Sequence, residues 1–139
     1  MRIPRSKFLA AVEALVGTPT GHRGRLPGVC LDCVGVPIAA LRSCGVRVED
    51  YSNYGMLPSS GELRAGLRAY CDEVDIATRA PGDILAMLEG SDTRHVAVIA
   101  SPVDGVETVV MARGLRVRRR RIASVLDSVT SCWRVRGIC

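Results

Sequence analysis

The stretch of sequence that decides the fold is residues 16–36, VGTPTGHRGRLPGVCLDCVGV. Its glycines and prolines disfavour regular structure and give a loop that can approach a substrate closely. Cys33 follows this loop, at the expected start of a helix over residues 32–44. Unpaired backbone N–H groups and the positive end of a helix dipole favour the thiolate, the nucleophilic form of cysteine. The stretch therefore predicts a reactive cysteine at a helix N-terminus; the simpler alternative is a buried small residue.

A candidate base for this cysteine stands far along the chain. His95 begins the apolar run HVAVI, residues 95–99, which is typical of a buried strand. Cysteine and histidine pairs that act together usually meet through the fold rather than in the sequence. Two interpretations stay open for His95: a catalytic base, or a histidine whose hydrogen bonds are satisfied at the end of a strand.

Four motifs occur in an order and at a spacing that resemble one family. They are Gly17-Thr18-Pro19 with Gly24-Arg25, then Asp32-Cys33-x-Gly35, then Pro81-Gly82-Asp83, and last His95-Val96-Ala97-Val98-Ile99. The set resembles the NlpC-type cell-wall cysteine peptidases, most closely the small single-domain versions encoded in phage tail gene clusters. The resemblance implies a papain-like fold, in which the nucleophile's helix packs on an antiparallel sheet. It also implies hydrolysis of amide bonds in peptidoglycan peptides, with Cys33 as nucleophile and His95 as base.

Two positions depart from the pattern of that family. Papain-like sites usually include a third polar residue that orients the imidazole, and the resemblance places this residue, commonly a histidine, at Met111. A thioether is only a weak hydrogen-bond acceptor. The family also favours a tyrosine near the nucleophile where this chain has Thr20. These departures keep an alternative open, a structural tail-tip protein that retains the peptidase fold with weakened or no activity.

Other polar residues border the predicted site. Asp32 is expected to cap the helix that follows it, and a role beside the thiolate is disfavoured because a nearby carboxylate raises the pKa of a thiol. His22 either lines the site or is an ordinary residue of the glycine-rich loop. Cys30 and Cys33 also form a Cys-x-x-Cys pair, but its context is not a β-α-β unit and the sequence offers no second ligand pair for zinc. We therefore predict no metal and no cofactor.

The helices are predicted from apolar spacing and capping residues. We expect a first helix capped by Ser6 and stopped at Gly17, then the helix over residues 32–44, with a first turn that Pro37 distorts. Ser59 and Glu62 predict a capping box before a third helix. Its apolar positions are Leu63, Leu67, Tyr70, Cys71 and Val74.

The second half of the chain reads as short strands separated by turns. We expect strands at residues 84–88, 96–100, 106–110 and 115–122, and residues 131–136 to close the sheet edge. A chain of 139 residues that is 47% hydrophobic suffices for one compact core. Helices followed by strands therefore predict a single α+β domain over residues 1–139.

Positive charge is concentrated at the C-terminal end. The net charge is +5, and residues 113–139 hold 8 basic residues against 1 acidic one, centred on Arg116–Arg121. Such a run is either a solvated strand or a docking surface for an acidic protein or an anionic wall polymer. Nucleic-acid binding is disfavoured because only 4% of the residues are aromatic and no reading helix accompanies the arginines.

The N-terminal sequence and the cysteines suggest where the protein is made. Glu13 interrupts the apolar run at residues 8–12, so we expect no signal peptide and synthesis in the reducing host cytoplasm. We find no apolar run of about 18 residues that would predict a membrane span. The resemblance implies a final location at the tail tip of a virion, with peptidoglycan and tail hub or tip proteins as partners.

Overall fold

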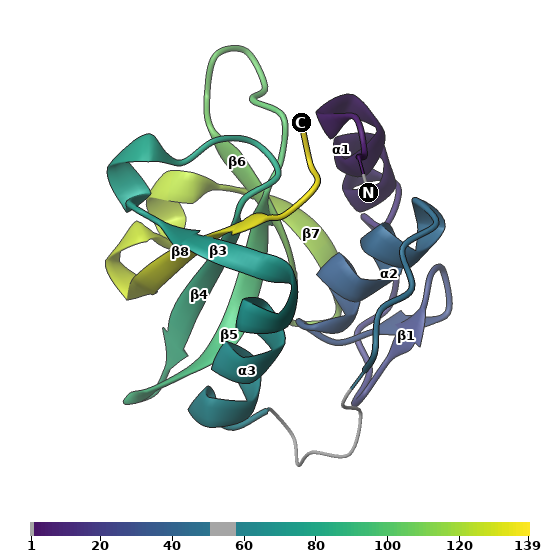
Figure 1. The fold of residues 1–139 in the computed structure, drawn as a ribbon. Helices are drawn as coiled ribbons and strands as arrows, with labels where there is room; N and C mark the ends of the chain where they lie inside the picture. The colour runs from purple at the N-terminus through teal and green to yellow at the C-terminus, as the bar shows by residue number, and fades with distance from the viewer. Residues whose placement is uncertain (1, 51–57) are drawn as a thin grey trace.

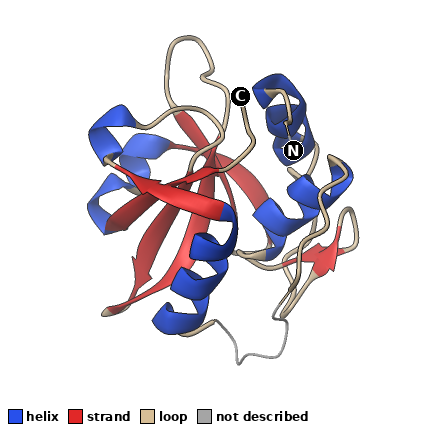
Figure 2. Ribbon diagram, viewed as in Figure 1, coloured by secondary structure: helices blue, strands red, loops and turns tan. Residues whose placement is uncertain are grey.

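Three helices lie against one six-stranded antiparallel sheet in the computed structural model, which describes residues 2–50 and 58–139 (Figures 1 and 2). The helices are α1 (Arg5–Glu13), α2 (Gly35–Ser43) and α3 (Ser60–Tyr70). The strand order is β3-β8-β4-β5-β6-β7. The strands are β3 (Cys71–Val74), β4 (Ile84–Glu89), β5 (Asp92–Ile99), β6 (Thr108–Arg113), β7 (Arg116–Arg121) and β8 (Val129–Val135). The predicted α+β arrangement, with helices packed on an antiparallel sheet, is confirmed.

Five smaller elements complete the described chain. A two-stranded hairpin, β1 (Arg25–Leu26) and β2 (Cys30–Leu31), lies inside the glycine-rich loop. The short 3-10 helices are η1 (Ile76–Thr78), η2 (Ile122–Ser124) and η3 (Leu126–Ser128). The two ends of the chain lie close together beside α1, joined by a parallel bridge between Ile3 and Ile138 (Figure 1).

Alternation along the strands divides the core between the two faces of the sheet. On β5, Val96 and Val98 join the helix-side cluster, whereas Ala97 and Ile99 join a second cluster on the other face. The helix-side cluster contains the buried faces of α1 and α2, and it also contains Cys33. The second cluster is Leu85, Met87, Ala97, Ile99, Val109, Met111, Ile122, Val125 and Cys132.

Two predicted helix starts are wrong. The first helix begins at Arg5 after Pro4, so Ser6 lies inside it and is not its cap. The second begins at Gly35 rather than at residue 32, which makes Pro37 its third residue. The first four N–H groups of a helix have no intrahelical partner, so a proline there removes no hydrogen bond. The predicted distortion by Pro37 therefore does not arise.

The third helix starts as predicted and ends earlier. Ser59 and Glu62 form the capping box, with hydrogen bonds of 3.0 and 3.1 Å in the two directions. The helix stops at Tyr70, and Cys71–Val74 become β3, which pairs with β8. Strand β8 therefore lies between β3 and β4 rather than closing an edge, and the two edges are β3 and β7.

The other strands agree with the prediction within a few residues, with one consequence for the site. Strand β5 begins at Asp92, so His95 lies within the strand rather than at its mouth. In the described part of the chain, the helices are too short or too polar to cross a membrane.

Candidate active site

Folding brings Cys33 against the strand that carries His95. Cys33 lies in the turn between β2 and α2, and only 3% of its surface is exposed. Its Sγ lies 4.0 Å from the carbonyl oxygen of Arg94, and the N–H of Val96 donates to the sulfur. The thiol therefore contacts the backbone of β5 immediately before and immediately after His95.

The thiol occupies a place beside β5 that a neighbouring strand would otherwise fill. Alternate residues of an antiparallel strand direct their backbone groups to opposite sides. Ile99 bonds on the β4 side, at Gly82 and Asp83, so Arg94 and Val96 face the β6 side. Among the described residues, the β5–β6 pairs end at Val98 with Val110, whereas β4 pairs with β5 as far as Asp92. The gap beside Arg94 and Val96 is where Cys33 sits.

His95 is buried and lacks a hydrogen-bond partner in the described structure. It is 5% exposed, and neither Nδ1 nor Nε2 has a partner among the described residues. The alternation of β5 directs its side chain to the same face as Ala97 and Ile99. Burial lowers the pKa of His95, and the positive charge of Arg113 lowers it further. The negative charges of Glu89 and Asp32 act in the opposite direction but are smaller than the effect of burial. The imidazole is therefore held in its neutral form.

The thiol is also held neutral, which contradicts the prediction from a helix N-terminus. Burial raises the pKa of Cys33 to about 12, and the carboxylate of Asp32 adds to the increase. The N–H groups of Val96 and Val34 and the charge of Arg25 act in the opposite direction but do not offset burial. Because the helix begins at Gly35, Cys33 also lies outside its first turn. The site holds a thiol and a neutral imidazole rather than an ion pair.

A buried ion network fixes the chain on either side of Cys33. Asp32 Oδ1 accepts a 2.7 Å hydrogen bond from the N–H of Gly35 and a 2.6 Å hydrogen bond from Arg25 Nη1. The same guanidinium donates to both carboxylate oxygens of Asp50, at 2.5 and 3.1 Å. Asp32 is not the N-cap residue that the sequence predicts, because that position is Val34, but its carboxylate does accept from the first N–H of α2. Its carboxylate raises the pKa of the thiol, as the sequence analysis predicted.

Close backbone contacts explain the glycines of two motifs. The carbonyl of Gly24 accepts from the Asp32 N–H at 3.2 Å and from Arg25 Nη1 at 2.9 Å. A Cβ on Gly35 would lie 2.2 Å from that carbonyl oxygen, and a Cβ on Gly21 or Gly24 would lie 2.5 Å from Cys30 Sγ. Cys30 therefore packs inside the glycine-rich loop. The motif residues Gly24-Arg25, Asp32 and Gly35 were recognised in the sequence only as part of the family resemblance. The hydrogen bonds that join them were not predicted.

Thr20, His22 and Met111, the remaining predicted site residues, are not among the described contacts of the thiol. Thr20 donates its hydroxyl to the Gly114 carbonyl and its N–H to the Leu115 carbonyl, so it ties the glycine-rich loop to the β6–β7 turn. His22 is exposed on that loop. Met111 is fully buried in the second cluster. Continuing the β5–β6 register places Met111 across from Ala97, on the face to which His95 points.

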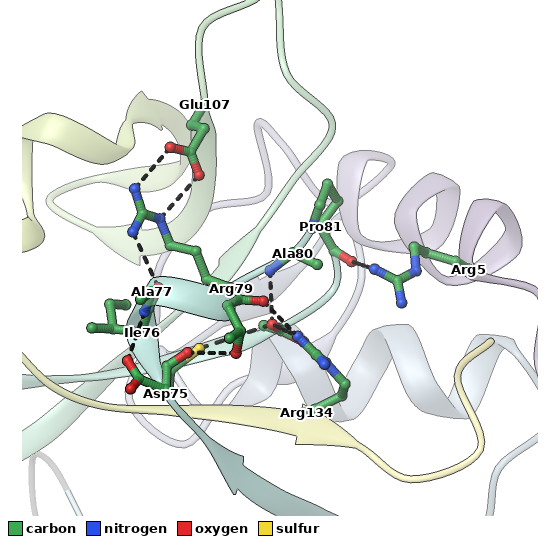
Figure 3. A network of polar contacts seen from close by, with 12 residues as sticks. Arg5, Asp75, Ile76, Ala77, Arg79, Ala80, Pro81, Glu107 and Arg134 are labelled. Carbon is green, nitrogen blue, oxygen red and sulfur yellow. Dashed lines mark hydrogen bonds and ion pairs between the residues drawn. The ribbon is translucent and has the colours of Figure 1, made fainter.

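The Pro-Gly-Asp motif is structural. Asp83, 2% exposed, accepts hydrogen bonds of 2.9 and 2.8 Å from Arg134 on β8 and 2.8 Å from the Ala80 N–H. Figure 3 labels the two donors to this carboxylate, Arg134 and Ala80, and the neighbouring pair of Arg79 and Glu107. Gly82 adopts a positive φ of 97° and bonds to Ile99 of β5. The motif therefore fixes the start of β4 against β5 and β8, and so holds the strand on which His95 lies.

Comparison with known proteins defines the fold. No family model matches the chain, and no curated protein matches its sequence. It is similar to the NlpC/p60 domain of the peptidoglycan hydrolase SagA, with a TM-score of 0.66, 16% identity, and coverage of 94% of this chain and 97% of that one. It is also similar to the P60 domain of an M. avium paratuberculosis antigen, with a TM-score of 0.63, 15% identity, and coverage of 94% of this chain and 91% of that one.

A third similar structure is described as non-catalytic. It is RipD of Mycobacterium tuberculosis, a "non-catalytic NlpC/p60 domain protein" with an "adaptation to peptidoglycan-binding function". Its TM-score is 0.64 at 18% identity, covering 96% of this chain and 97% of that one. The chain thus has the fold of NlpC/p60 domains, a fold found in both hydrolytic and non-catalytic proteins.

Proposed function

We propose that the protein is a cysteine peptidase that hydrolyses amide bonds in the peptides of bacterial peptidoglycan. The observation that carries this proposal is the contact of the Cys33 thiol with the β5 backbone on both sides of His95. The motif order and the NlpC/p60 fold supply the substrate class.

The chemistry starts from two neutral groups. In this proposal His95 accepts the thiol proton as the sulfur attacks the carbonyl carbon, so the thiolate forms only during the attack. Because neither ring nitrogen lies within hydrogen-bond distance of the sulfur in the described structure, this transfer requires the Cys33 turn or the imidazole to move. The N–H of Cys33 is the candidate donor to the developing oxyanion. His95 then gives its proton to the leaving amine, and water hydrolyses the thioester to release the acid and restore the thiol. Both groups are buried, so substrate access requires the chain around Cys33 to open.

The experiment compares two buried cysteines. Purified peptidoglycan is incubated with the wild type, Cys33→Ala and Cys71→Ala, and the released fragments are measured by mass spectrometry. Cys71 is a matched control because it is also buried and burial also raises its pKa to about 12. We expect Cys33→Ala to lose at least about a thousandfold in rate and Cys71→Ala to keep its rate. Equal release by Cys33→Ala and the wild type would remove Cys33 from the chemistry.

A second candidate is a non-catalytic protein that keeps this fold. The observation that favours it is the absence of a partner for His95 among the described residues, with buried Met111 on the same face. Incubation of the wild type and Cys33→Ala with purified peptidoglycan separates the two functions. Fragment release that is lost in Cys33→Ala supports the peptidase, and co-sedimentation of the wild type with intact peptidoglycan without any fragment release supports the non-catalytic protein.

We also propose that the protein acts at the tail tip of a phage during cell-wall penetration, with tail hub or tip proteins as partners. The support is the likeness of its motifs to the small peptidases of tail gene clusters. Mass spectrometry of purified virions tests this setting. Detection in tail fractions at a fixed ratio to the hub protein is expected, and its absence from virions would contradict the proposal.

A further inference from the structure

Four arginines line one face of the sheet edge. Arg113 ends β6, and Arg116, Arg118 and Arg120 alternate along β7. In the β6–β7 register Arg113 lies opposite Arg116, whereas Arg118 lies opposite Met111 and Arg120 opposite Val109. Met111 and Val109 both belong to the second cluster. Cross-strand partners project to the same face, so the four side chains share that face. We call them the arginine row, and all four are exposed.

The fold does not neutralise the arginine row. Among the described residues, none of the four pairs with a carboxylate; Arg116 donates to the Gly17 carbonyl at 2.8 Å. Arg119, on the opposite face of β7, bonds to Glu13 at 2.9 Å. Like charges directly across two strands, as in the pair of Arg113 and Arg116, destabilise a sheet. Apart from the bond of Arg116 to Gly17, the row therefore carries a folding cost that no ion pair of the described residues on that face offsets.

Edge protection does not account for the row. Charges on an edge strand prevent pairing with other chains, but Arg113 lies on β6, which is an interior strand of the sheet even though its described pairing with β5 ends at Val110. The outer edge of β7 is also already covered where the row begins. There Val117 exchanges backbone hydrogen bonds with Gly17 and Thr18, at 2.9 and 2.8 Å.

The row begins beside the candidate active site. Thr20 holds the β6–β7 turn through Leu115 and forms a bridge to Leu31, two residues before Cys33. The charge of Arg113 also acts on His95, as its effect on the pKa of that histidine shows. From there, Arg116 to Arg120 extend for about 13 Å at the usual rise of a strand. Their spacing of two residues matches the spacing of side chains on one side of an extended peptide.

We propose that the arginine row binds the carboxylates of an extended acidic peptide that enters the candidate active site. The inference rests on the proposed function, because the peptide is the substrate's own chain. The row supplies guanidinium groups at strand spacing, and Arg116 contacts the glycine-rich loop that precedes Cys33. If the row binds the substrate, the substrate is a peptide with at least two free carboxylates beyond the bond that is cleaved.

The test measures binding without cleavage. The protein carries Cys33→Ala, and the probe is a fluorescent stem tetrapeptide of peptidoglycan with its carboxyls free, compared with the same peptide fully amidated. Binding is followed by anisotropy at 50 and 200 mM NaCl. Arg118→Gln with Arg120→Gln removes the outer half of the row, which leaves the charge near His95 unchanged. The matched control, Arg47→Gln with Arg64→Gln, makes the same charge change at two exposed arginines elsewhere.

The expected results separate recognition from bulk charge. The free-acid peptide should bind about tenfold more tightly than the amidated one, and the row variant should lose most of that difference while the control keeps it. Equal binding of both peptides, or equal loss in both variants, overturns the inference. The inference is also overturned if a 20-base-pair DNA duplex binds more tightly than the free-acid peptide and loses this affinity in the row variant. The row would then bind polyanions in general.

Failure of this inference is distinguishable from failure of the proposed function. If the wild type releases no peptidoglycan fragments but the row still binds the free-acid peptide, the proposed cleavage is wrong and the binding site stands. If the wild type cleaves and the row variant binds the peptide unchanged, the cleavage stands and the row is wrong.

Discussion

The surroundings of Cys33 and of His95 differ in how completely their polar groups are paired. Beside Cys33, Asp32 bonds to Arg25 and to the Gly35 N–H, and Arg25 bonds to Asp50. Beside His95, neither ring nitrogen has a partner in the described structure. The two groups lie on either side of one strand backbone, yet one side is fully connected and the other is not.

This difference separates what folding requires from what chemistry requires. Asp32 lies before α2 and joins the glycine-rich loop to the first residue of that helix, so its contacts stabilise the fold whether or not Cys33 reacts. A partner for His95 would mainly orient the imidazole, and its loss leaves the sheet intact. The fold can therefore persist while the base side of the site loses its orienting group.

The largest expected effect comes from breaking the connected side at Gly35. A Cβ on Gly35 would meet the Gly24 carbonyl at 2.2 Å, and neither backbone segment can shift without losing the Asp32 contacts. We expect Gly35→Ala to lower the free energy of unfolding by about 4 kcal/mol, measured in urea. Gly66→Ala is the control, because a Cβ there has open space in α3 and should be neutral or stabilising by up to about 1 kcal/mol. Equal stability of the two variants would contradict the proposed close packing.

The next effect tests the ion network itself. Arg25→Met leaves Asp32 and Asp50 buried without their shared cation, and we expect a loss of about 3 kcal/mol in unfolding free energy. The pKa of Cys33 should rise as well, because Arg25 lowers it. Arg79→Met is the control: its pair with Glu107 is more exposed and should cost less than about 1 kcal/mol. If Arg25→Met costs no more than Arg79→Met, the network does not hold the site.

Local signals in the sequence predicted much of the fold. The capping box of Ser59 and Glu62 involves side chains and backbone three residues apart, so the sequence alone could specify it. Alternation and turn residues predicted β4 to β7 for the same reason. Strand β3 was missed because Cys71 and Val74 continue the apolar spacing of α3, and only pairing with β8, about sixty residues later, makes them a strand.

The candidate site depended more on distant contacts. The motifs predicted that Cys33 and His95 meet; the thiol does reach the β5 backbone on either side of His95, but neither ring nitrogen has a partner among the described residues. The burial that keeps both groups neutral comes from packing across the whole sheet. Arg25 and Asp50 are 25 residues apart and no local pattern joins them. The start of α2 moved to Gly35 because Gly24 and Arg25 hold residue 32 outside the helix.

A hydrogen-bond partner supplied to the His95 imidazole should change the rate of peptidoglycan cleavage by an intermediate amount. Met111→His places an imidazole on the face to which His95 points, where the family resemblance puts the orienting residue. We expect peptidoglycan cleavage to rise ten- to a hundredfold, the usual effect of an orienting group. Met111→Leu removes the thioether at similar volume and should leave the rate unchanged. A folded Met111→His variant that cleaves no faster than Met111→Leu would place the missing orientation elsewhere.

The smallest expected effect measures the unpaired state of His95 directly. Burial lowers its pKa below the ordinary value of 6.5, so between pH 7 and 5.5 the unfolded chain binds a proton that the folded chain does not. The stability that His95 contributes is complete above pH 6.5 and is lost as the pH falls. The wild type should therefore lose about 1 kcal/mol more than His95→Phe over that interval, measured in urea. A carboxylate partner would instead raise the pKa of His95 and make the folded protein gain stability over the same interval, so the sign of the change decides whether the base side of the site is paired.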